Sequence, residues 1–288
     1  MELRPEAIGT YRRTARPGLR HLDLGPPAPV DLLLADVGTL SFVIIATNPA
    51  SLEWCEREPD ASRREMVDDV AGFLERLRQG SPRAEVVYLS TDYVFNGAKG
   101  HYSEDDPPRP LQVYGRHKLA AERAVLESGL RARVIRTSFL YGENRWEPAA
   151  DRTPPLVFVS AARRRARTVV TDDLFSSPTE ARSLAALLWS LEGIDGEDVL
   201  HAAGGPRVCR RDVLDATLEV WGLPPWPGIE VVHADAEGRI PGQTLRRPRD
   251  SSLDSSRMRA LTGSSLPELR DGLRAVSRRV KAAGAADA

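Results

Sequence analysis

Short apolar runs alternate with helical patterns through the first two thirds of the chain, and this alternation constrains the fold more than any other feature. Strands that are buried on both faces give such runs, and helices that link parallel strands give the patterns between them. The sequence therefore predicts the α/β class, with helices on both faces of a parallel sheet. The predicted strands cover residues 7–11, 20–24, 42–47, 85–90 and 133–138.

One helical pattern, at residues 61–80, is especially regular. Its apolar residues recur at the spacing of a helix and fall on one stripe: Met66, Val70, Phe73, Leu74 and Leu77. We expect this stripe to pack against the core. Gly80 is a reasonable end for the helix, because glycine is common just after the last helical residue.

Beyond Gly142 the pattern loosens into stretches rich in Pro and Gly, at residues 143–155 and 222–250. Such composition is typical of turns and loops. We therefore expect a second, smaller lobe that is dominated by loops.

Charge and cysteine content limit the partners. The formal net charge is −1 and no apolar stretch approaches the length of a membrane span, so we expect neither nucleic acid nor a membrane. Cys55 and Cys209 stand far apart and the five histidines are scattered, so we predict no disulfide and no metal site. The first residues lack the apolar core of a signal peptide, and a cytoplasmic location is expected.

Tyr114 and Lys118 are four residues apart, which places both side chains on one face of a helix. A free tyrosine has a pKa of about 10, and a neighbouring cation lowers that pKa by stabilising the phenolate. Thr91 follows a predicted strand, at the edge where open parallel sheets bind ligands. The three residues are candidates for proton transfer to a substrate oxygen, although Tyr-x-x-x-Lys also occurs by chance on solvent-facing helices.

Several ordered motifs give this pair a context. "STDYVFNG" stands at residues 90–97, "YGRHKLAAE" at 114–122 and "RTSFLYG" at 136–142, and "RRPRDSSLDSSRM" follows at 246–258. With these motifs the chain resembles the dTDP-4-dehydrorhamnose reductase family of the extended short-chain dehydrogenase/reductase superfamily, over nearly its whole length. The resemblance implies a Rossmann-like, dinucleotide-binding region over residues 1–142. It also implies a mainly substrate-binding lobe over residues 143–288, with some segments returning to the first region.

The resemblance also implies NADPH-dependent reduction of a 4-keto nucleotide sugar, as in dTDP-rhamnose biosynthesis. Tyr114 would act as general acid, Lys118 would bind the nicotinamide ribose and tune the tyrosine, and Thr91 would hydrogen-bond the carbonyl. Asp92 takes a sugar-contacting position. Phe139 stands where the family often has Trp, so it forms either an aromatic wall against the sugar or part of the core.

The glycine-rich turn of such enzymes is not found. Members of the family begin with a strand and a Gly-x-x-Gly-x-x-Gly turn that holds the cofactor pyrophosphate, and no glycines of this chain have that spacing. Its first residues resemble the second and third strands of the family, so we interpret the sequence as lacking the first strand. A wrongly assigned start codon explains this better than a natural sheet without its central strand.

Other cofactor contacts are implied at Tyr11, Arg12 and Arg13, and at Ala46 and Thr47. Two guanidinium groups favour the 2′-phosphate of NADPH, although NADH is also compatible. Without a cofactor role, the two arginines would lie on a solvated edge of the protein, and Ala46 and Thr47 would serve only packing. Because the glycine-rich turn is missing, we expect weak cofactor binding.

Two further alternatives concern function. The chain also resembles the regulatory beta subunit of methionine adenosyltransferase, which favours a non-catalytic binding protein of the same fold; a homodimer or a regulatory partner is compatible with either reading.

Four arginines, Arg163, Arg164, Arg165 and Arg167, form a basic cluster. We interpret it as the solvated end of a helix rather than a diphosphate site.

Overall fold

A computed structural model describes residues 6–12, 15–25, 27–47, 51–143, 153–196 and 198–286. The chain forms two compact units. The first contains Met1–Ser90, Val113–Ile135 and Leu188–Leu200, and the second contains Thr91–Gln112, Arg136–Leu187 and His201–Ala288. Each unit is described by itself. The predicted functional division at residue 142 stays a prediction.

The first unit is built on a sheet with the order β10-β5-β4-β3. These strands are β3 (Phe42–Ile45), β4 (Glu85–Thr91), β5 (Arg131–Thr137) and β10 (Val199–His201). β3 runs parallel to β4, with Phe42 opposite Glu85. The α/β class with a parallel sheet is therefore confirmed.

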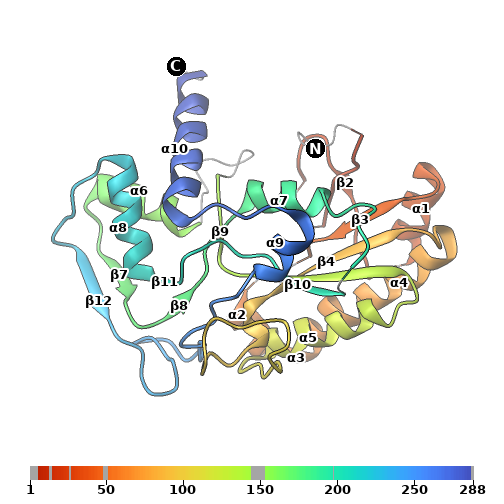
Figure 1. Cartoon of the computed structure of the whole chain (residues 1–288), viewed down its shortest axis with the longest axis horizontal. Coiled ribbons are helices and arrows are strands. Elements are labelled where there is room, and N and C mark those ends of the chain that lie inside the picture. The colour runs from red at the N-terminus through yellow and green to blue at the C-terminus, as the bar shows by residue number, and fades with distance from the viewer. Residues whose placement is uncertain are drawn as a thin grey trace. The chain divides into compact units, whose positions relative to one another are not determined.

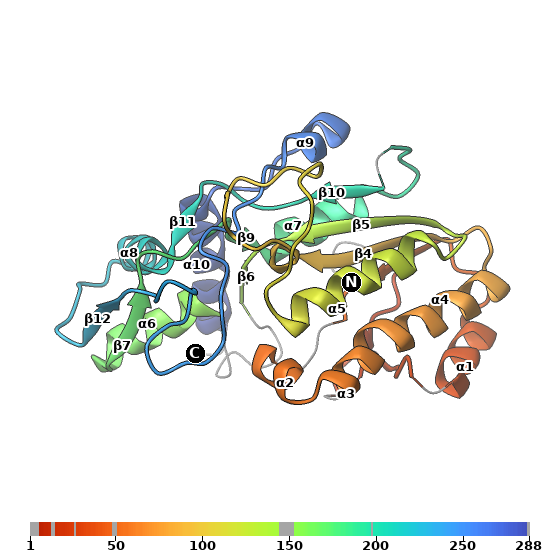
Figure 2. The same cartoon turned by 90° about the horizontal axis from the view of Figure 1, so that it is seen from below.

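The stripe predicted for residues 61–80 is buried in full. The predicted single helix consists of α3 (Pro59–Arg63), a π-helical segment (Arg64–Asp68) and α4 (Asp69–Gly80). α4 and α5 (Val113–Leu126) run beside β4 and β5 in Figure 2. Side chains of these two helices and two strands share one apolar core.

The start of the chain is less regular than predicted. The strands expected at 7–11 and 20–24 are only β1 (Thr10–Tyr11) and β2 (Arg20–His21), which pair with each other in parallel. A strand with one short partner has few ladder bonds to extend it, and the rest of both runs is irregular. The helices α1 (Pro27–Val37) and α2 (Leu52–Arg57) were not predicted.

The second unit is made of short strand pairs and helices (Figure 1). Its pairs are β6 (Leu140–Tyr141) with β9 (Thr179–Glu180), β7 (Thr168–Thr171) with β12 (Ile229–Val232), and β8 (Phe175–Ser176) with β11 (Val208–Cys209). Its helices are α6 (Pro154–Arg164), α8 (Arg210–Trp221), α9 (Ser256–Thr262) and α10 (Leu269–Ala286), and α7 (Ala181–Trp189) begins in it. A second apolar core lies here, with Leu214 and Leu273 fully buried.

No helix in the described part of the chain combines the length and the apolar character needed to cross a bilayer.

Candidate functional site

Tyr114 and Lys118 both come from α5, as predicted. The N–H of Val113, the first residue of this helix, donates to Glu56 Oε1 at 2.7 Å, which fixes where the helix begins. Both side chains are buried, with exposed fractions of 9% for Tyr114 and 3% for Lys118. Both side chains are therefore shielded from bulk water. In such a low-dielectric environment a charged neighbour shifts a pKa more than it does in water.

The ammonium of Lys118 is held by the ends of two strands. Its Nζ donates to the carbonyl oxygens of Thr47 at 3.1 Å and Leu89 at 2.9 Å, and to the hydroxyl of Tyr88 at 3.2 Å. An ammonium group has three donors, so all are used inside this unit. Burial lowers the pKa of Lys118 to about 8, and the charge of Glu122 opposes that shift.

Tyr88 was not predicted as a site residue. Its ring centre lies 4.7 Å from Lys118 Nζ, and burial raises the pKa of its hydroxyl well above the ordinary value. The hydroxyl therefore stays protonated and accepts from the ammonium. Tyr88 lies three residues before Thr91 in a continuous apolar run, and nothing in its sequence context sets it apart from core residues.

Thr91 is the last residue of β4, as predicted, and it belongs to the second unit. Its Oγ1 donates to Asp92 Oδ1 at 3.2 Å and accepts the N–H of Tyr93 at 3.2 Å. The short 3-10 helix Asp92–Val94 that follows is capped by this hydroxyl. The orientation of the Thr91 side chain is thereby fixed from both sides.

Asp92 lies in the interior of the second unit, with an exposed fraction of 3%. Its Oδ2 accepts from Ser138 Oγ at 2.7 Å and Ser251 Oγ at 2.5 Å. Burial raises the pKa of Asp92 to about 6, although the three hydroxyl groups act in the opposite direction. The carboxylate therefore joins three segments of this unit, and a sugar contact for it stays a prediction.

Phe139 is partly buried and packs against the core of the second unit. One face of its ring meets a guanidinium group, since Arg210 Cζ lies 4.0 Å from the ring centre. Its φ of 24° is rare for a bulky residue. The packing alternative for Phe139 therefore agrees with the structure, and a wall against the sugar stays a prediction.

Four of the predicted cofactor residues line one cavity of about 760 Å³ in the first unit: Tyr11, Arg12, Ala46 and Thr47. A cavity of this volume suits a large ligand. Much of its wall is apolar, with Leu22, Phe42 and Phe73 among the lining residues.

The charge of Arg12 is already countered. Its guanidinium pairs with Glu65 at 2.6 Å and with Asp23 at 3.2 Å. A 2′-phosphate at this position would compete with both carboxylates. Arg13 lies outside the described residues.

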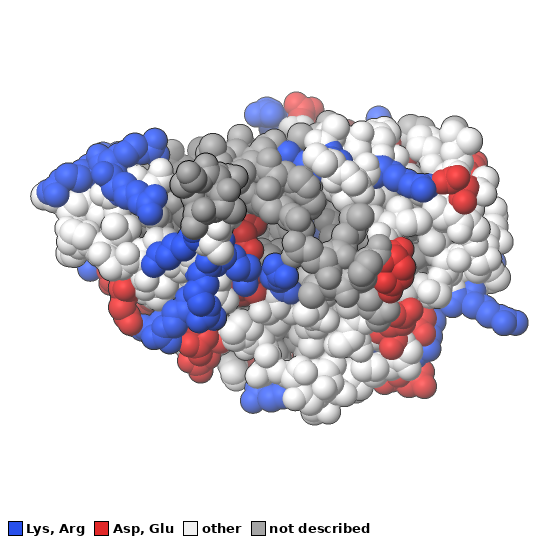
Figure 3. Space-filling view, turned by 90° about the horizontal axis from the view of Figure 1, so that it is seen from above, with Lys and Arg blue, Asp and Glu red and all other residues white. Residues whose placement is uncertain are grey.

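The basic cluster lies at the end of α6, as expected for a solvated helix terminus. Arg163 and Arg164 are in its last turn, Arg165 caps it with φ 53°, and Arg167 pairs with Glu230 at 2.6 Å. All four side chains are exposed. Figure 3 shows Lys and Arg side chains gathered on the part of the surface that contains α6 and α10.

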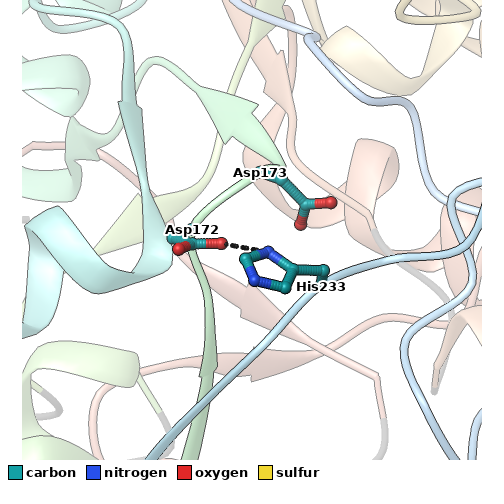
Figure 4. A group of neighbouring side chains, drawn as sticks. All are labelled: Asp172, Asp173 and His233. Atoms are coloured by element: carbon teal, nitrogen blue, oxygen red, sulfur yellow. Dashed lines mark ion pairs between the residues drawn. The ribbon is translucent and has the colours of Figure 1, made fainter.

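One group of possible metal ligands occurs among the described residues. Ligand atoms of Asp172, Asp173 and His233 lie within 4.8 Å of one another (Figure 4). His233 Nδ1 is 2.8 Å from Asp172 Oδ1, and Asp173 already pairs with Arg249 at 3.2 Å. Asp173 also accepts the N–H of Ala234, so its carboxylate is engaged within the protein. These contacts explain the group without a metal.

The fold is that of an α/β protein of the short-chain dehydrogenase/reductase kind. The chain belongs to the RmlD substrate binding domain family, which it matches over residues 15–282. This finding confirms the resemblance to dTDP-4-dehydrorhamnose reductases.

Two curated relatives illustrate the range of the family. The probable low-salt glycan biosynthesis reductase Agl14 of Haloferax volcanii is 32% identical over 247 residues, or 84% of this chain and 79% of that protein. Methionine adenosyltransferase 2 subunit beta of Bos taurus is 28% identical over 264 residues, or 88% of this chain and 75% of that protein.

Solved structures agree on the fold. A hypothetical dTDP-4-dehydrorhamnose reductase from Sulfolobus tokodaii has a TM-score of 0.77 at 27% identity, covering 94% of this chain and 92% of that one. The dTDP-4-dehydrorhamnose reductase of Bacillus anthracis, in complex with NADP, has a TM-score of 0.78 at 20% identity and covers 90% and 87%.

Proposed function

We propose that this protein reduces the keto carbon of a nucleotide-linked 4-keto sugar with NADPH as the hydride donor. The observation that carries the proposal is the pairing of Tyr114 and Lys118, both buried, one turn apart on α5. Further support comes from relatives that are named as reductases, including one of dTDP-4-dehydrorhamnose at 27% identity.

In this proposal Tyr114 gives a proton to the carbonyl oxygen and Lys118 stabilises the phenolate that remains. Because the pKa of Lys118 is about 8, most of its population is charged at neutral pH. Thr91 donates a hydrogen bond to the same oxygen, in place of the one it now gives to Asp92. Phe139 forms the aromatic wall against the sugar.

Tyr11, Arg12, Ala46 and Thr47 line a cavity large enough for part of a dinucleotide, and they are the residues proposed to hold the cofactor, with Arg13 and Lys118. When bound, NADPH supplies the hydride. The printed sequence contains no Gly-x-x-Gly-x-x-Gly turn. In Rossmann-like folds, pyrophosphate binding at such a turn contributes much of the cofactor affinity.

The proposal is tested by following NADPH consumption with a dTDP-linked 4-keto sugar. We expect substrate-dependent turnover, and at least about a hundredfold loss in Tyr114→Phe because general acid catalysis is removed. Thermal unfolding of both proteins serves as the control for folding. Equal rates in the two proteins would contradict the role of Tyr114.

A second candidate function is non-catalytic binding and regulation. It is favoured by the 28% identity to methionine adenosyltransferase 2 subunit beta. This reading predicts no turnover even at saturating NADPH, together with a change in the rate of a methionine adenosyltransferase when the chain is added.

A further inference from the structure

Glu122 is a buried carboxylate in the first unit that the proposed reaction does not use. It ends the motif "YGRHKLAAE" and lies on α5 one turn after Lys118, with an exposed fraction of 2%. Burial removes the hydration of a carboxylate, and this costs free energy unless other groups compensate its charge. A carboxylate at this place therefore needs both a hydrogen-bond donor and a positive charge nearby.

Ser90 supplies the hydrogen bond. Its Oγ donates to Glu122 Oε1 at 2.5 Å, and Ser90 is buried too, with an exposed fraction of 4%. Ser90 lies on β4 two residues after Tyr88, so both side chains are on the same face of the strand. Tyr88 contacts Lys118 and Ser90 contacts Glu122, so one face of the strand contacts one face of the helix through two polar pairs.

Lys118 supplies the positive charge. Residues four apart on a helix are neighbours on its surface, and the charge of Glu122 favours the charged form of Lys118 against the effect of burial. The three hydrogen bonds of the ammonium group go to neutral oxygens, those of Thr47, Tyr88 and Leu89. Glu122 therefore contributes the negative charge that these neutral acceptors lack.

The field of Glu122 reaches the hydrogen-bond partner of Lys118 as well. Burial has the largest effect on the pKa of Tyr88, and the charges of Tyr114 and Glu122 raise this pKa further. A hydroxyl group that keeps its proton so firmly is a poor acid at neutral pH. Tyr88 therefore stays neutral beside Lys118 and does not replace Tyr114 as the proton donor.

Charged groups of the neighbouring helical segments act on a different residue. Burial lowers the pKa of His117, and Arg63 of α3, Asp68 of the π-helical segment and Glu56 of α2 add smaller effects. His117 is next to Lys118 in sequence, so its side chain points about 100° away around the helix. The pKa of Lys118 responds to burial and to the carboxylate one turn later.

We propose that Glu122 is a positioning residue of the reductase site: held by Ser90, its carboxylate keeps Lys118 in the charged form that the reaction needs. The proposal rests on the proposed function, because Lys118 is there to stabilise the phenolate that Tyr114 leaves behind. Without the carboxylate, burial would favour the neutral amine, and the phenolate would form beside an uncharged group. Glu122 thus acts on the reaction only through Lys118.

The experiment titrates Lys118 by NMR in the full chain. The sequence has three lysines, so lysine labelled with 13C at the ε carbon gives three signals, and Lys99→Arg and Lys281→Arg identify the other two. We expect a midpoint of about 8 for Lys118 in the wild type. In Glu122→Gln the midpoint should fall by at least about one pH unit, because an opposite charge is removed. The matched control, Glu127→Gln, removes an exposed carboxylate just after α5 and should leave the midpoint unchanged.

Two further variants separate charge from packing. Glu122→Asp keeps the carboxylate and should show less than half of the fall seen in Glu122→Gln. The double variant Ser90→Ala with Glu122→Leu removes both members of the buried hydrogen bond, leaves no unpaired polar group, and should show the full fall. The proposal is overturned if the midpoint falls by less than about 0.3 pH units in either neutral variant.

Turnover gives a separate measurement. A purely structural role would lower kcat/KM by the same factor at every pH, whereas loss of the Lys118 charge lowers it progressively as pH rises. The ratio of kcat/KM in Glu122→Gln to that in the wild type should fall at least about threefold from pH 6 to pH 8, and a constant ratio would contradict the proposal. Failure of the reductase proposal would appear differently, as no NADPH consumption by the wild type at any pH while the NMR midpoint still depends on Glu122.

Discussion

At the scale of single residues, two of the candidate residues, one in each unit, are charged groups that are taken out of water. Lys118 is surrounded by carbonyl oxygens and a tyrosine hydroxyl, and Asp92 by hydroxyl groups. Neutral donors and acceptors compensate a buried charge only in part, so burial shifts both pKa values toward the neutral form. Both groups therefore link the stability of the fold to pH.

For Asp92 the direction can be worked out. Its pKa is about 6 in the folded protein against an ordinary value of 3.8, so the folded state holds the proton more tightly. The stabilisation is complete below about pH 4 and is lost as pH rises through 6, for a total of about 3 kcal/mol. Asp92→Asn should remove this component. Urea unfolding of both proteins from pH 4 to 7 measures it, and parallel curves would contradict the assignment.

At the scale of elements, a close approach of two loops shapes the second unit. Gly97, with φ +77°, lies against the Arg-Pro-Arg segment, and a Cβ there would stand 2.5 Å from Arg249 N. The Gly97 carbonyl accepts the N–H of Asp250 at 3.1 Å, which holds the two loops together. The position of the Arg-Pro-Arg segment therefore depends on this contact.

Gly97→Ala should destabilise the protein more than Gly242→Ala. Both glycines have φ near +78°, but a Cβ at Gly242 meets no atom within 4 Å. The Gly242 variant is expected to cost about 1 kcal/mol through the backbone alone, and the Gly97 variant about 2 kcal/mol more through the clash. Equal changes in the free energy of unfolding would show that the loop approach is not tight.

The cavity lined by β1 and β3 allows a test of cofactor preference. Arg12→Ala should reduce the preference for NADPH over NADH, because the guanidinium is the proposed phosphate ligand. Glu65→Gln should strengthen NADPH binding several-fold, since it removes one of the two carboxylates that compete for Arg12. Dissociation constants for both cofactors measure this, and unchanged ratios in both variants would place the phosphate elsewhere.

At the scale of the whole molecule, local patterns predicted the elements better than the site. The apolar stripe of α4, the end of β4 at Thr91 and the helical pair Tyr114 and Lys118 are periodicity and motif features, and the structure contains them. β1 and β2 are shorter than their apolar runs suggest, because strand length depends on pairing partners as well as on composition.

Local sequence patterns could not predict contacts between segments that are distant in the chain. The hydroxyl groups on Asp92 come from Ser138 and Ser251, and Phe139 meets Arg210. Ser138 and Ser251 lie inside motifs on which the family resemblance was based. The motifs did not predict that both hydroxyl groups would donate to Asp92. Arg210 stands beside Arg211 in sequence, and nothing in the sequence indicates that Arg210 packs on Phe139 whereas Arg211 pairs with Asp215.

The central claim is that the protein reduces a keto sugar through Tyr114, and isotope transfer tests it most directly. The chain is incubated with saturating NADPH that carries deuterium at the transferable position and with a dTDP-linked 4-keto sugar, and the product is analysed by mass spectrometry. We predict a sugar one deuterium heavier at the former carbonyl carbon, formed at least about a hundred times faster by the wild type than by Tyr114→Phe. No labelled sugar from the wild type, at a cofactor concentration shown by titration to saturate it, would contradict the account.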